Sequence, residues 1–151
     1  MAAASFMYTM TGTLDAKGRV CIPAPFRDVL AAQETPGVLV CPCYHEPALD
    51  GFGEEAIRHV RQMQASLDPF FSREHDVRAT AILARTVNLP RDENGRVRLP
   101  DEMIAYAGLK DRVTFVGLDR KFQIWDSERY RVVEAERLKQ AVDLLNGRSV
   151  S

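Results

Sequence analysis

Two short segments of this sequence carry a carboxylate, a glycine and an arginine at the same spacing. Residues 15–23 read DAKGRVCIP, and residues 92–100 read DENGRVRLP. Asp, Gly, Arg, Val and Pro therefore recur at identical positions, 77 residues apart. The rigid fork of an arginine can grip a phosphate, or the O6/N7 edge of guanine, through two parallel hydrogen bonds. The repeated segment is thus a candidate for contact with nucleic acid.

The first and fourth residues of each segment predict a tight turn. Asp at the first position and Gly at the fourth are typical of a type I turn, in which glycine is free to adopt the left-handed conformation. With apolar and β-branched residues on both sides, the natural product is a β-hairpin with a glycine bulge. We therefore assign turn-structuring roles to Asp15, Gly18, Asp92 and Gly95, with each Asp accepting backbone N–H bonds within its own turn.

The cations of the two predicted hairpins are the candidate DNA-binding residues. Lys17 lies at the tip of the first turn and Arg19 just past its bulge. Arg96 holds the matching place in the second hairpin, and Arg98, two residues further along a strand, lies on the same face. We expect Lys17 to neutralise phosphate and the arginines to read or clamp the duplex. Alternatively, Arg19 and Arg96 only brace the turn by pairing with the Asp four residues earlier; both roles hold if the Asp orients the Arg.

A second cluster, Cys41, Cys43 and His45, has the residue types of a metal site. Structural zinc takes four ligands, usually from C-x₂₋₄-C pairs, and the one remaining cysteine, Cys21, offers no second pair. We therefore expect free thiols buried in strands beside an exposed histidine, and no metal or other cofactor. A small metal-dependent or thiol-dependent enzyme built on this cluster remains an alternative. The sequence has no G-x-S-x-G, P-loop or G-x-G-x-x-G motif, so we expect that the protein is not an enzyme.

The elements that must position these residues repeat in the same order. In each copy the motif is followed by a helix-like piece (23–32 and 100–108), an apolar strand-like run (37–41 and 112–117) and an amphipathic helix (54–67 and 127–146). A further helix, predicted over residues 72–84 with Ser72 as its N-cap, bridges the copies. We interpret the pattern as a duplication: a first half at 6–52 and a second at 82–125, packed as one body.

The composition is that of an ordinary globular chain without a strong charge bias. The 151 residues are 46% hydrophobic and 27% charged, and the net charge is −1. No run approaches the ~20 apolar residues of a membrane span, and the N-terminus MAAASFMYTM lacks the basic region of a signal peptide. We expect a cytoplasmic protein with no membrane partner. Because a polybasic tail is missing, DNA affinity would come from a few placed cations, repeated by self-association.

The repeated motifs resemble the signatures of the MraZ family of bacterial transcriptional regulators. The string DAKGRVCIPAPFR is similar to the first signature of that family, and DENGRVRLPDEM to the second. The segment AGLKDRVTFVGLDRKFQIWDSERY resembles the family's C-terminal stretch. The resemblance therefore runs in the right order over nearly the whole chain.

This resemblance implies an α+β fold: a pseudo-dimeric swapped-hairpin β-barrel made of two tandem AbrB/SpoVT-like halves, with helices packed outside. It also implies a nucleoid-associated, sequence-specific DNA-binding protein that assembles into a ring and binds double-stranded DNA with short direct repeats. The implied target is a promoter region for division and cell-wall genes, including the protein's own gene. An antitoxin-like protein of the same barrel class, which binds DNA and also neutralises a toxin, is the alternative.

The resemblance also assigns roles to individual residues. The family's DXXXR signature maps onto residues 15–19 and 92–96, so Lys17, Arg19 and Arg96 inherit its DNA-binding role. The second copy departs from the first by having Asn94 where the first has Lys17. This difference favours a larger contribution from the first hairpin.

Overall fold

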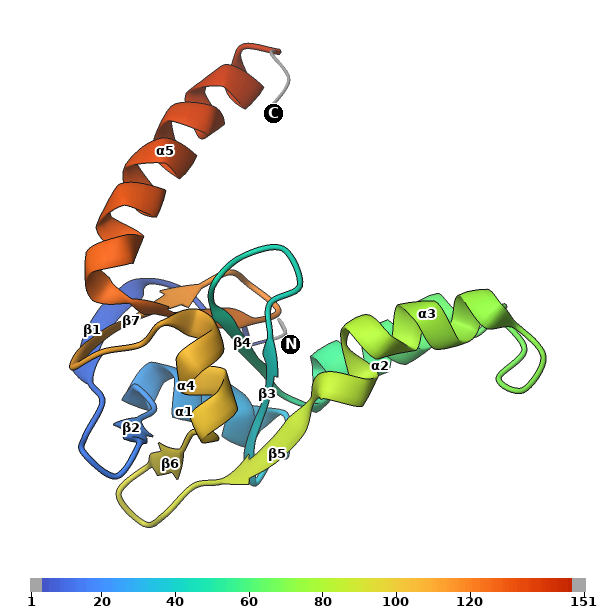
Figure 1. Ribbon diagram of the computed structural model, residues 1–151, viewed down its shortest axis with the longest axis horizontal. Coiled ribbons are helices and arrows are strands. Elements are labelled where there is room, and N and C mark those ends of the chain that lie inside the picture. Colours follow the sequence, from blue (N-terminus) through green and yellow to red (C-terminus); the bar gives the residue numbers. More distant parts are fainter. Residues whose placement is uncertain (1–3, 148–151) are drawn as a thin grey trace.

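The computed structural model describes residues 4–147, which form an α+β fold with antiparallel sheets (Figure 1). The strands are β1 (Thr9–Thr13), β2 (Arg19–Cys21), β3 (Gly37–Pro42), β4 (Leu49–Phe52), β5 (Val87–Pro90), β6 (Arg96–Arg98), β7 (Arg112–Gly117) and β8 (Phe122–Asp126). The helices are α1 (Ala24–Ala32), α2 (Glu54–Gln64), α3 (Arg73–Ala81), the 3₁₀ helix η1 (Leu83–Arg85), α4 (Asp101–Ala107) and α5 (Ser127–Leu145). The predicted order of elements is thus observed, with α2 and α3 each ending three residues before the prediction.

The strands pair across the two sequence copies. One sheet has the order β1-β7-β8-β4-β3-β5, and β2 pairs with β6 in a second, two-stranded sheet. The first strand of each copy lies against the third strand of the other, because β1 pairs with β7 and β5 pairs with β3. The larger sheet keeps two open edges, at β1 and β5, and does not close into a ring of strands within residues 4–147. The strands on either side of each predicted hairpin turn therefore pair with strands of the other copy and not with each other, so the predicted β-hairpins do not form within residues 4–147.

A cluster of aromatic rings joins the two copies in the core. Phe6 and Phe26 come from the first copy and Phe122 from β8 of the second, and all three are fully buried. The ring centroid of Phe122 lies 5.1 Å from that of Phe6 and 4.9 Å from that of Phe26. Centroid separations in this range are favourable for aromatic pairs. The two copies therefore contribute side chains to one shared hydrophobic core.

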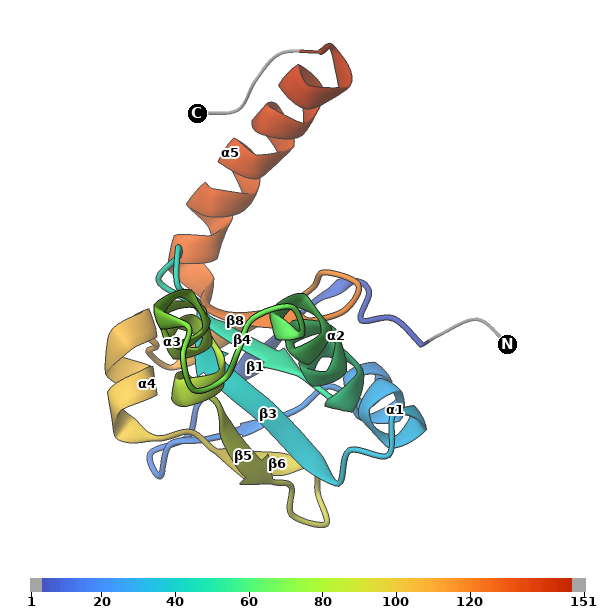
Figure 2. The same cartoon turned by 90° about the vertical axis from the view of Figure 1, so that its right-hand side faces the viewer.

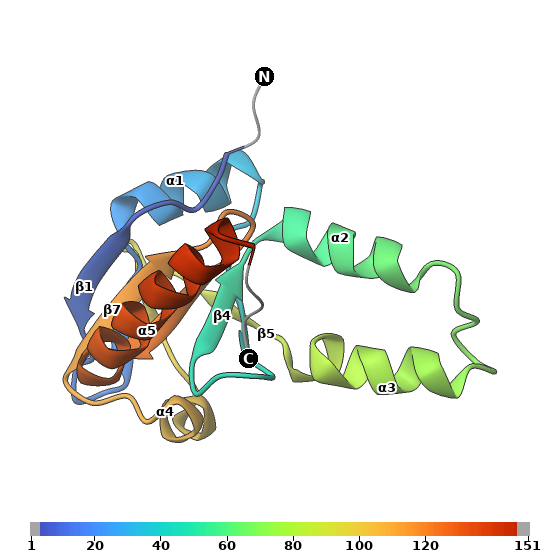
Figure 3. The ribbon, with the colours of Figure 1, turned by 90° about the horizontal axis from the view of Figure 1, so that it is seen from above.

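The helices differ from the prediction that all of them pack around the outside of the body. α1 and α4 lie on the sheets, but α5 runs outward from the body and buries only Tyr130 (Figures 1 and 2). α2 and α3 form a second projection, in which they run side by side (Figure 3), and α3 buries no residue. As a result, much of the apolar stripe of α5 is left uncovered within residues 4–147: Leu138 and Val142 are 64% and 56% exposed.

Local signals at the helix starts agree with the structure. The Ser72 hydroxyl accepts a hydrogen bond from the backbone N–H of His75 at 3.1 Å, as expected of an N-cap. At the start of α5 the Asp126 carboxylate accepts from the N–H of Arg129 at 3.2 Å. Within residues 4–147, no helix combines the length and the apolar character needed to cross a membrane.

Candidate nucleic-acid interface

The turn between β1 and β2 is organised by the Asp15 side chain. Its Oδ1 atom accepts the backbone N–H groups of Lys17, at 2.9 Å, and of Arg19, at 2.8 Å. The backbone N–H of Gly18 donates to the Asp15 carbonyl at 3.0 Å, and Gly18 has a φ of 79°. Only glycine adopts this backbone conformation without a steric cost. The first turn therefore has the hydrogen bonds that its residue types favour.

The turn between β5 and β6 repeats this geometry. The Oδ1 atom of Asp92 accepts the backbone N–H groups of Asn94 and Arg96, both at 2.9 Å. Gly95 donates to the Asp92 carbonyl at 2.9 Å and has a φ of 77°. Residues 15–19 form the first loop, and residues 92–96 form the second loop.

In each loop the aspartate also holds the arginine. The Nε atom of Arg19 lies 2.8 Å from Asp15 Oδ2, and the Nε atom of Arg96 lies 2.9 Å from Asp92 Oδ2. No hydrogen bond engages the terminal nitrogens of either guanidinium within residues 4–147, and the two arginine side chains are 31% and 38% exposed. The Asp thus fixes the direction of the Arg while its outer edge stays open to a ligand. The bracing role and the contact role are compatible in this geometry.

The charge of both aspartates is favoured by the same contacts. The pKa of Asp15 lies below its ordinary value of 3.8, chiefly because the backbone N–H of Arg19 donates to the carboxylate. The backbone N–H of Arg96 is likewise the largest cause of the lowered pKa of Asp92. A depressed carboxyl pKa favours the folded loop above pH 3.8, and that contribution is lost as the pH falls through the lower folded value. Both carboxylates are therefore charged at neutral pH.

Pairing of β2 with β6 brings the two loops to the same end of the body, opposite α5 (Figure 1). Arg19 is the register partner of Arg98 in this sheet. The Nε atom of Arg98 donates to the backbone carbonyl of Lys17 at 3.1 Å, so a residue of the second copy supports the tip of the first loop. Arg98 is 65% exposed, and one terminal nitrogen lies 3.8 Å from Asp101. Lys17, Arg19 and Arg98 thus gather at the first loop.

Two further arginines lie beside the second loop and were not assigned a role from the sequence. Arg27 of α1 donates from Nη1 to the Ile22 carbonyl at 2.8 Å and lies against Gly95. Arg91, directly before the second loop, donates from Nη2 to the Thr35 carbonyl at 3.3 Å. A comparison of the two sequence copies could have found them. At the offset of 77 residues, Arg27 aligns with Ile104 and Arg91 aligns with Leu14. At both places an arginine in one copy stands opposite an apolar residue in the other.

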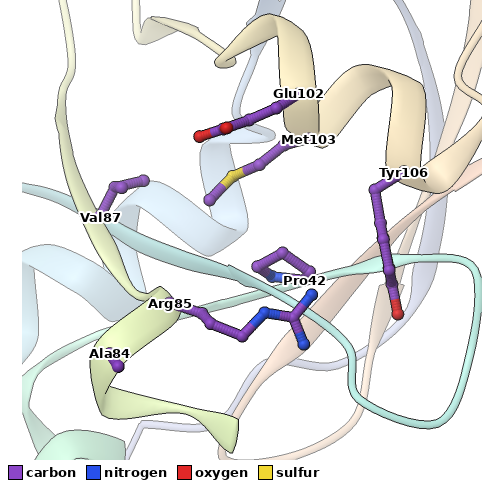
Figure 4. Close-up of a pocket in the computed structure, with 7 residues that line it drawn as sticks. All are labelled: Pro42, Ala84, Arg85, Val87, Glu102, Met103 and Tyr106. Atoms are coloured by element: carbon purple, nitrogen blue, oxygen red, sulfur yellow. The ribbon is translucent and has the colours of Figure 1, made fainter. Parts of the chain in front are cut away.

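A hollow lies beside α4. It measures ≈ 350 Å³ and lies between the end of β3, η1 and α4 (Figure 4). The Arg85 guanidinium lies 5.3 Å from the centre of the Tyr106 ring, and the Tyr106 hydroxyl donates to the Cys43 carbonyl. Its lining residues include no Ser, Cys or His that could act as a nucleophile or a base.

The cysteine and histidine cluster does not form a metal site in residues 4–147, where no group of three or more His, Cys, Asp or Glu side chains is placed to hold an ion. Cys41 packs with Leu39, Phe52 and Ile57, whereas Cys43 packs in a separate cluster around Trp125. His45 is exposed, as predicted, and its Nδ1 lies 3.5 Å from Cys43 Sγ. Burial raises the pKa of Cys41 to about 11 and also raises that of Cys43, so neither is a ready thiolate nucleophile.

One cysteine departs from the prediction that all three thiols are buried in strands. Cys41 and Cys43 are buried free thiols, but Cys21 is exposed. Cys21 lies at the end of β2, where its Sγ atom is 3.4 Å from the Asn94 carbonyl of the second loop. The strand alternation explains this placement, because Val20 occupies the inward-facing position and Cys21 therefore faces outward.

Comparison with known proteins gives a consistent result. Residues 82–143 match the family model described as "MraZ protein, putative antitoxin-like". The transcriptional regulator MraZ of Xanthobacter autotrophicus is 40% identical over 139 residues, which cover 92% of this chain and 88% of that protein. The transcriptional regulator MraZ of Azorhizobium caulinodans is 42% identical over 131 residues, covering 87% of this chain and 83% of that protein. The chain therefore belongs to the MraZ family of transcriptional regulators.

Proposed function

We propose that this chain is a transcriptional regulator that binds double-stranded DNA in a sequence-specific way through its first and second loops. The observation that carries the proposal is the pair of arginines, Arg19 and Arg96, each held at Nε by its own aspartate with its terminal nitrogens open. An arginine oriented in advance loses less side-chain entropy when it binds a base edge or a phosphate. Membership of a family of transcriptional regulators agrees with this role.

Within the proposed interface the residues have different tasks. Arg19 and Arg96 read or clamp the duplex, and exposed Lys17 at the tip of the first loop neutralises phosphate. Arg98 supports the first loop through the Lys17 carbonyl and adds a third cation there. The turn-structuring residues Asp15, Gly18, Asp92 and Gly95 hold the two backbones in shape.

We also propose that the fold is a swapped-hairpin β-barrel of the AbrB/SpoVT class, with halves at 6–52 and 82–125 packed as one body. This proposal is supported by the strand pairing, in which β1 and β5 each lie in the sheet against the other copy, and β2 pairs with β6 about the pseudo-symmetry axis. In such an arrangement the two halves of one chain take the place of a symmetric dimer. As a consequence, the first and second loops lie at the same end of the body (Figure 1).

We further propose that the chain self-associates into a ring. The support for this is the apolar surface that the projecting helices leave uncovered: α5 exposes Leu138, Val142 and Leu145, and the turn between α2 and α3 exposes Phe70 and Phe71. Exposed patches of this kind usually mark an interface. A ring would present successive loops to short direct repeats spaced by ~10 bp, one turn of the duplex. Sedimentation velocity of the full chain tests this part; a monomer at micromolar concentration would rule it out.

The proposed target is a promoter region for division and cell-wall genes that includes the protein's own gene, and the proposed location is the cytoplasm, on the nucleoid. The test compares DNA from upstream of the protein's own gene with a scrambled duplex of equal length. We expect tighter binding to the upstream DNA at every salt concentration and a linear fall of log affinity with log salt, because phosphate contacts release counterions. Equal affinity for both duplexes would contradict sequence-specific binding.

The two alternatives have weaker support. A family of transcriptional regulators is not a family of enzymes, and the buried thiols of Cys41 and Cys43 agree with this. An antitoxin-like role is named in the description of the family model. A toxin-wrapping tail would favour that role, whereas residues Ser127–Leu145 form a continuous helix. Both the antitoxin-like alternative and the main proposal include DNA binding through the two loops.

A further inference from the structure

The space beneath each loop is filled by one residue that precedes the loop and one residue from a helix of the other copy. Beneath the first loop these are Leu14 and Ile104, both packed against the hydrophobic core. An added Cβ on Gly18 would lie 3.3 Å from Cδ1 of Ile104. At the equivalent place beneath the second loop, an added Cβ on Gly95 would lie 2.3 Å from Nη1 of Arg27. An apolar pair beneath one loop is therefore matched by two arginines beneath the other.

These two arginines are half-buried and lack, among the described residues, the carboxylate partner that a covered charge normally has. Neither Arg27 nor Arg91 has a carboxylate within 4.0 Å among residues 4–147. Among residues 4–147, the buried Nη1 atom of Arg91 donates to no acceptor, and its Nη2 atom donates only to the Thr35 carbonyl, at 3.3 Å. The pKa of Arg91 is lowered, mainly by desolvation and to a lesser extent by the positive charge of Arg27. A covered guanidinium nitrogen without an acceptor is costly, and two neighbouring positive charges repel, so this pair would gain from an anion.

A hollow beside the second loop gives an anion access to the pair. It measures ≈ 540 Å³ and is lined by Arg27, Asp28, Ala31, Arg91 and the loop residues Asp92, Glu93, Asn94 and Gly95. Asp92 is neutralised by Arg96, which leaves Asp28 and Glu93 as the acidic groups at the rim. Both are exposed, where water and salt weaken their repulsion of an anion. Both arginines line the hollow and are less exposed than these two acidic residues.

We propose that Arg27 and Arg91 form a phosphate-binding site beneath the second loop, and that its ligand is a backbone phosphate of the DNA that this loop contacts. The proposal rests on the proposed function for the choice of DNA as the source of the phosphate. Arg91 reaches the ligand by turning its guanidinium outward, which gives up one long hydrogen bond. The second loop, with Asn94 where the first has Lys17, thereby gains a phosphate anchor of its own.

The first arm of the test measures DNA affinity against salt for the full chain and two variants. Arg91→Leu introduces the residue that the first copy has at this place, and Arg27→Gln removes the second charge. Arg58→Gln, on the exposed side of α2, is the matched control. We expect both site variants to lose several-fold in affinity for upstream and scrambled DNA alike. The slope of log affinity against log salt should decrease by about one per chain, and the control should match the wild type.

The second arm uses inorganic phosphate without DNA and follows the thermal unfolding midpoint at constant ionic strength. We expect phosphate to raise the midpoint of the wild type and of Arg58→Gln above that in chloride, and to leave Arg91→Leu unchanged. A response to phosphate together with unchanged DNA binding in the variants would support the site and assign it to free phosphate instead of DNA. No response in either arm would overturn the site. If the wild type fails to bind DNA, the proposed function fails, and this arm still decides the phosphate site.

Discussion

Replacing Arg19 with alanine is expected to weaken selective DNA binding by about 5- to 150-fold while the chain remains folded. A bidentate contact between an arginine and a base is worth about 1–3 kcal/mol, which corresponds to this range. Among residues 4–147 the removed guanidinium makes its hydrogen bond to Asp15, in a partly exposed ion pair that adds little stability. Adding Arg96→Ala should remove the selectivity for upstream DNA over scrambled DNA. Fluorescence anisotropy with labelled duplexes, at one fixed salt concentration, measures both losses.

Two control variants separate contact with DNA from support of the loop. Arg58→Ala changes an exposed arginine of α2, far from both loops, and should bind as the wild type does. Asp15→Asn keeps an oxygen for the backbone N–H groups but removes the charge that holds Arg19. We expect an intermediate loss for it, because Arg19 is present but no longer oriented. Full affinity of Arg19→Ala would show that the first loop does not read the duplex.

The largest effect on stability is expected at Phe122. Its ring is fully buried between Phe6 and Phe26 and lies against Gly51, where an added Cβ would be 2.4 Å from the ring. Truncation of such a ring to alanine removes its transfer free energy and leaves a cavity, at a cost of about 3–5 kcal/mol. Chemical denaturation of Phe122→Ala should show this loss in the free energy of unfolding.

The number of steps in which Phe122→Ala unfolds is a second expected result. Because Phe122 belongs to the second copy and its ring partners to the first, the variant should still unfold in one cooperative step. Phe70→Ala is the matched control, since Phe70 is 88% exposed and its truncation should change stability by less than about 0.5 kcal/mol. Two separate transitions in Phe122→Ala would contradict a shared core and with it the proposal of one packed body.

The parts of the structure that could be predicted from the sequence are those that depend on local chemistry. The two turns follow from an aspartate that can accept backbone N–H groups and a glycine that can take a positive φ, so residues 15–18 and 92–95 specify them unaided. The start of α3 follows in the same way from the hydroxyl of Ser72. The repeat in the sequence predicted the order of the remaining elements, because the two copies contain strand-like and helix-like segments in the same order.

The remainder depends on contacts between distant parts of the chain. The sequence pattern did not show that α5 leaves the body, because an apolar stripe has the same spacing whether it meets the same chain or a different one. The sequence pattern also did not show that β3 ends at Pro42, between Cys41 and Cys43, and that the two thiols enter different clusters. The meeting of Arg27 and Arg91 depends on the pairing of β2 with β6, which no local window of sequence contains.

The measurement that tests the central claim most directly is a map of the contacts between the loops and DNA. A photo-reactive amino acid is placed at Asn94 in the second loop, at Ala16 in the first, and at His59 on α2 as a control, and each variant is irradiated with DNA from upstream of its own gene. All three positions are exposed, so the label can reach a bound ligand. We expect covalent adducts at positions 16 and 94, removed by excess unlabelled upstream DNA, and none at position 59. Adducts at position 59 with none at either loop would show that another surface binds the duplex.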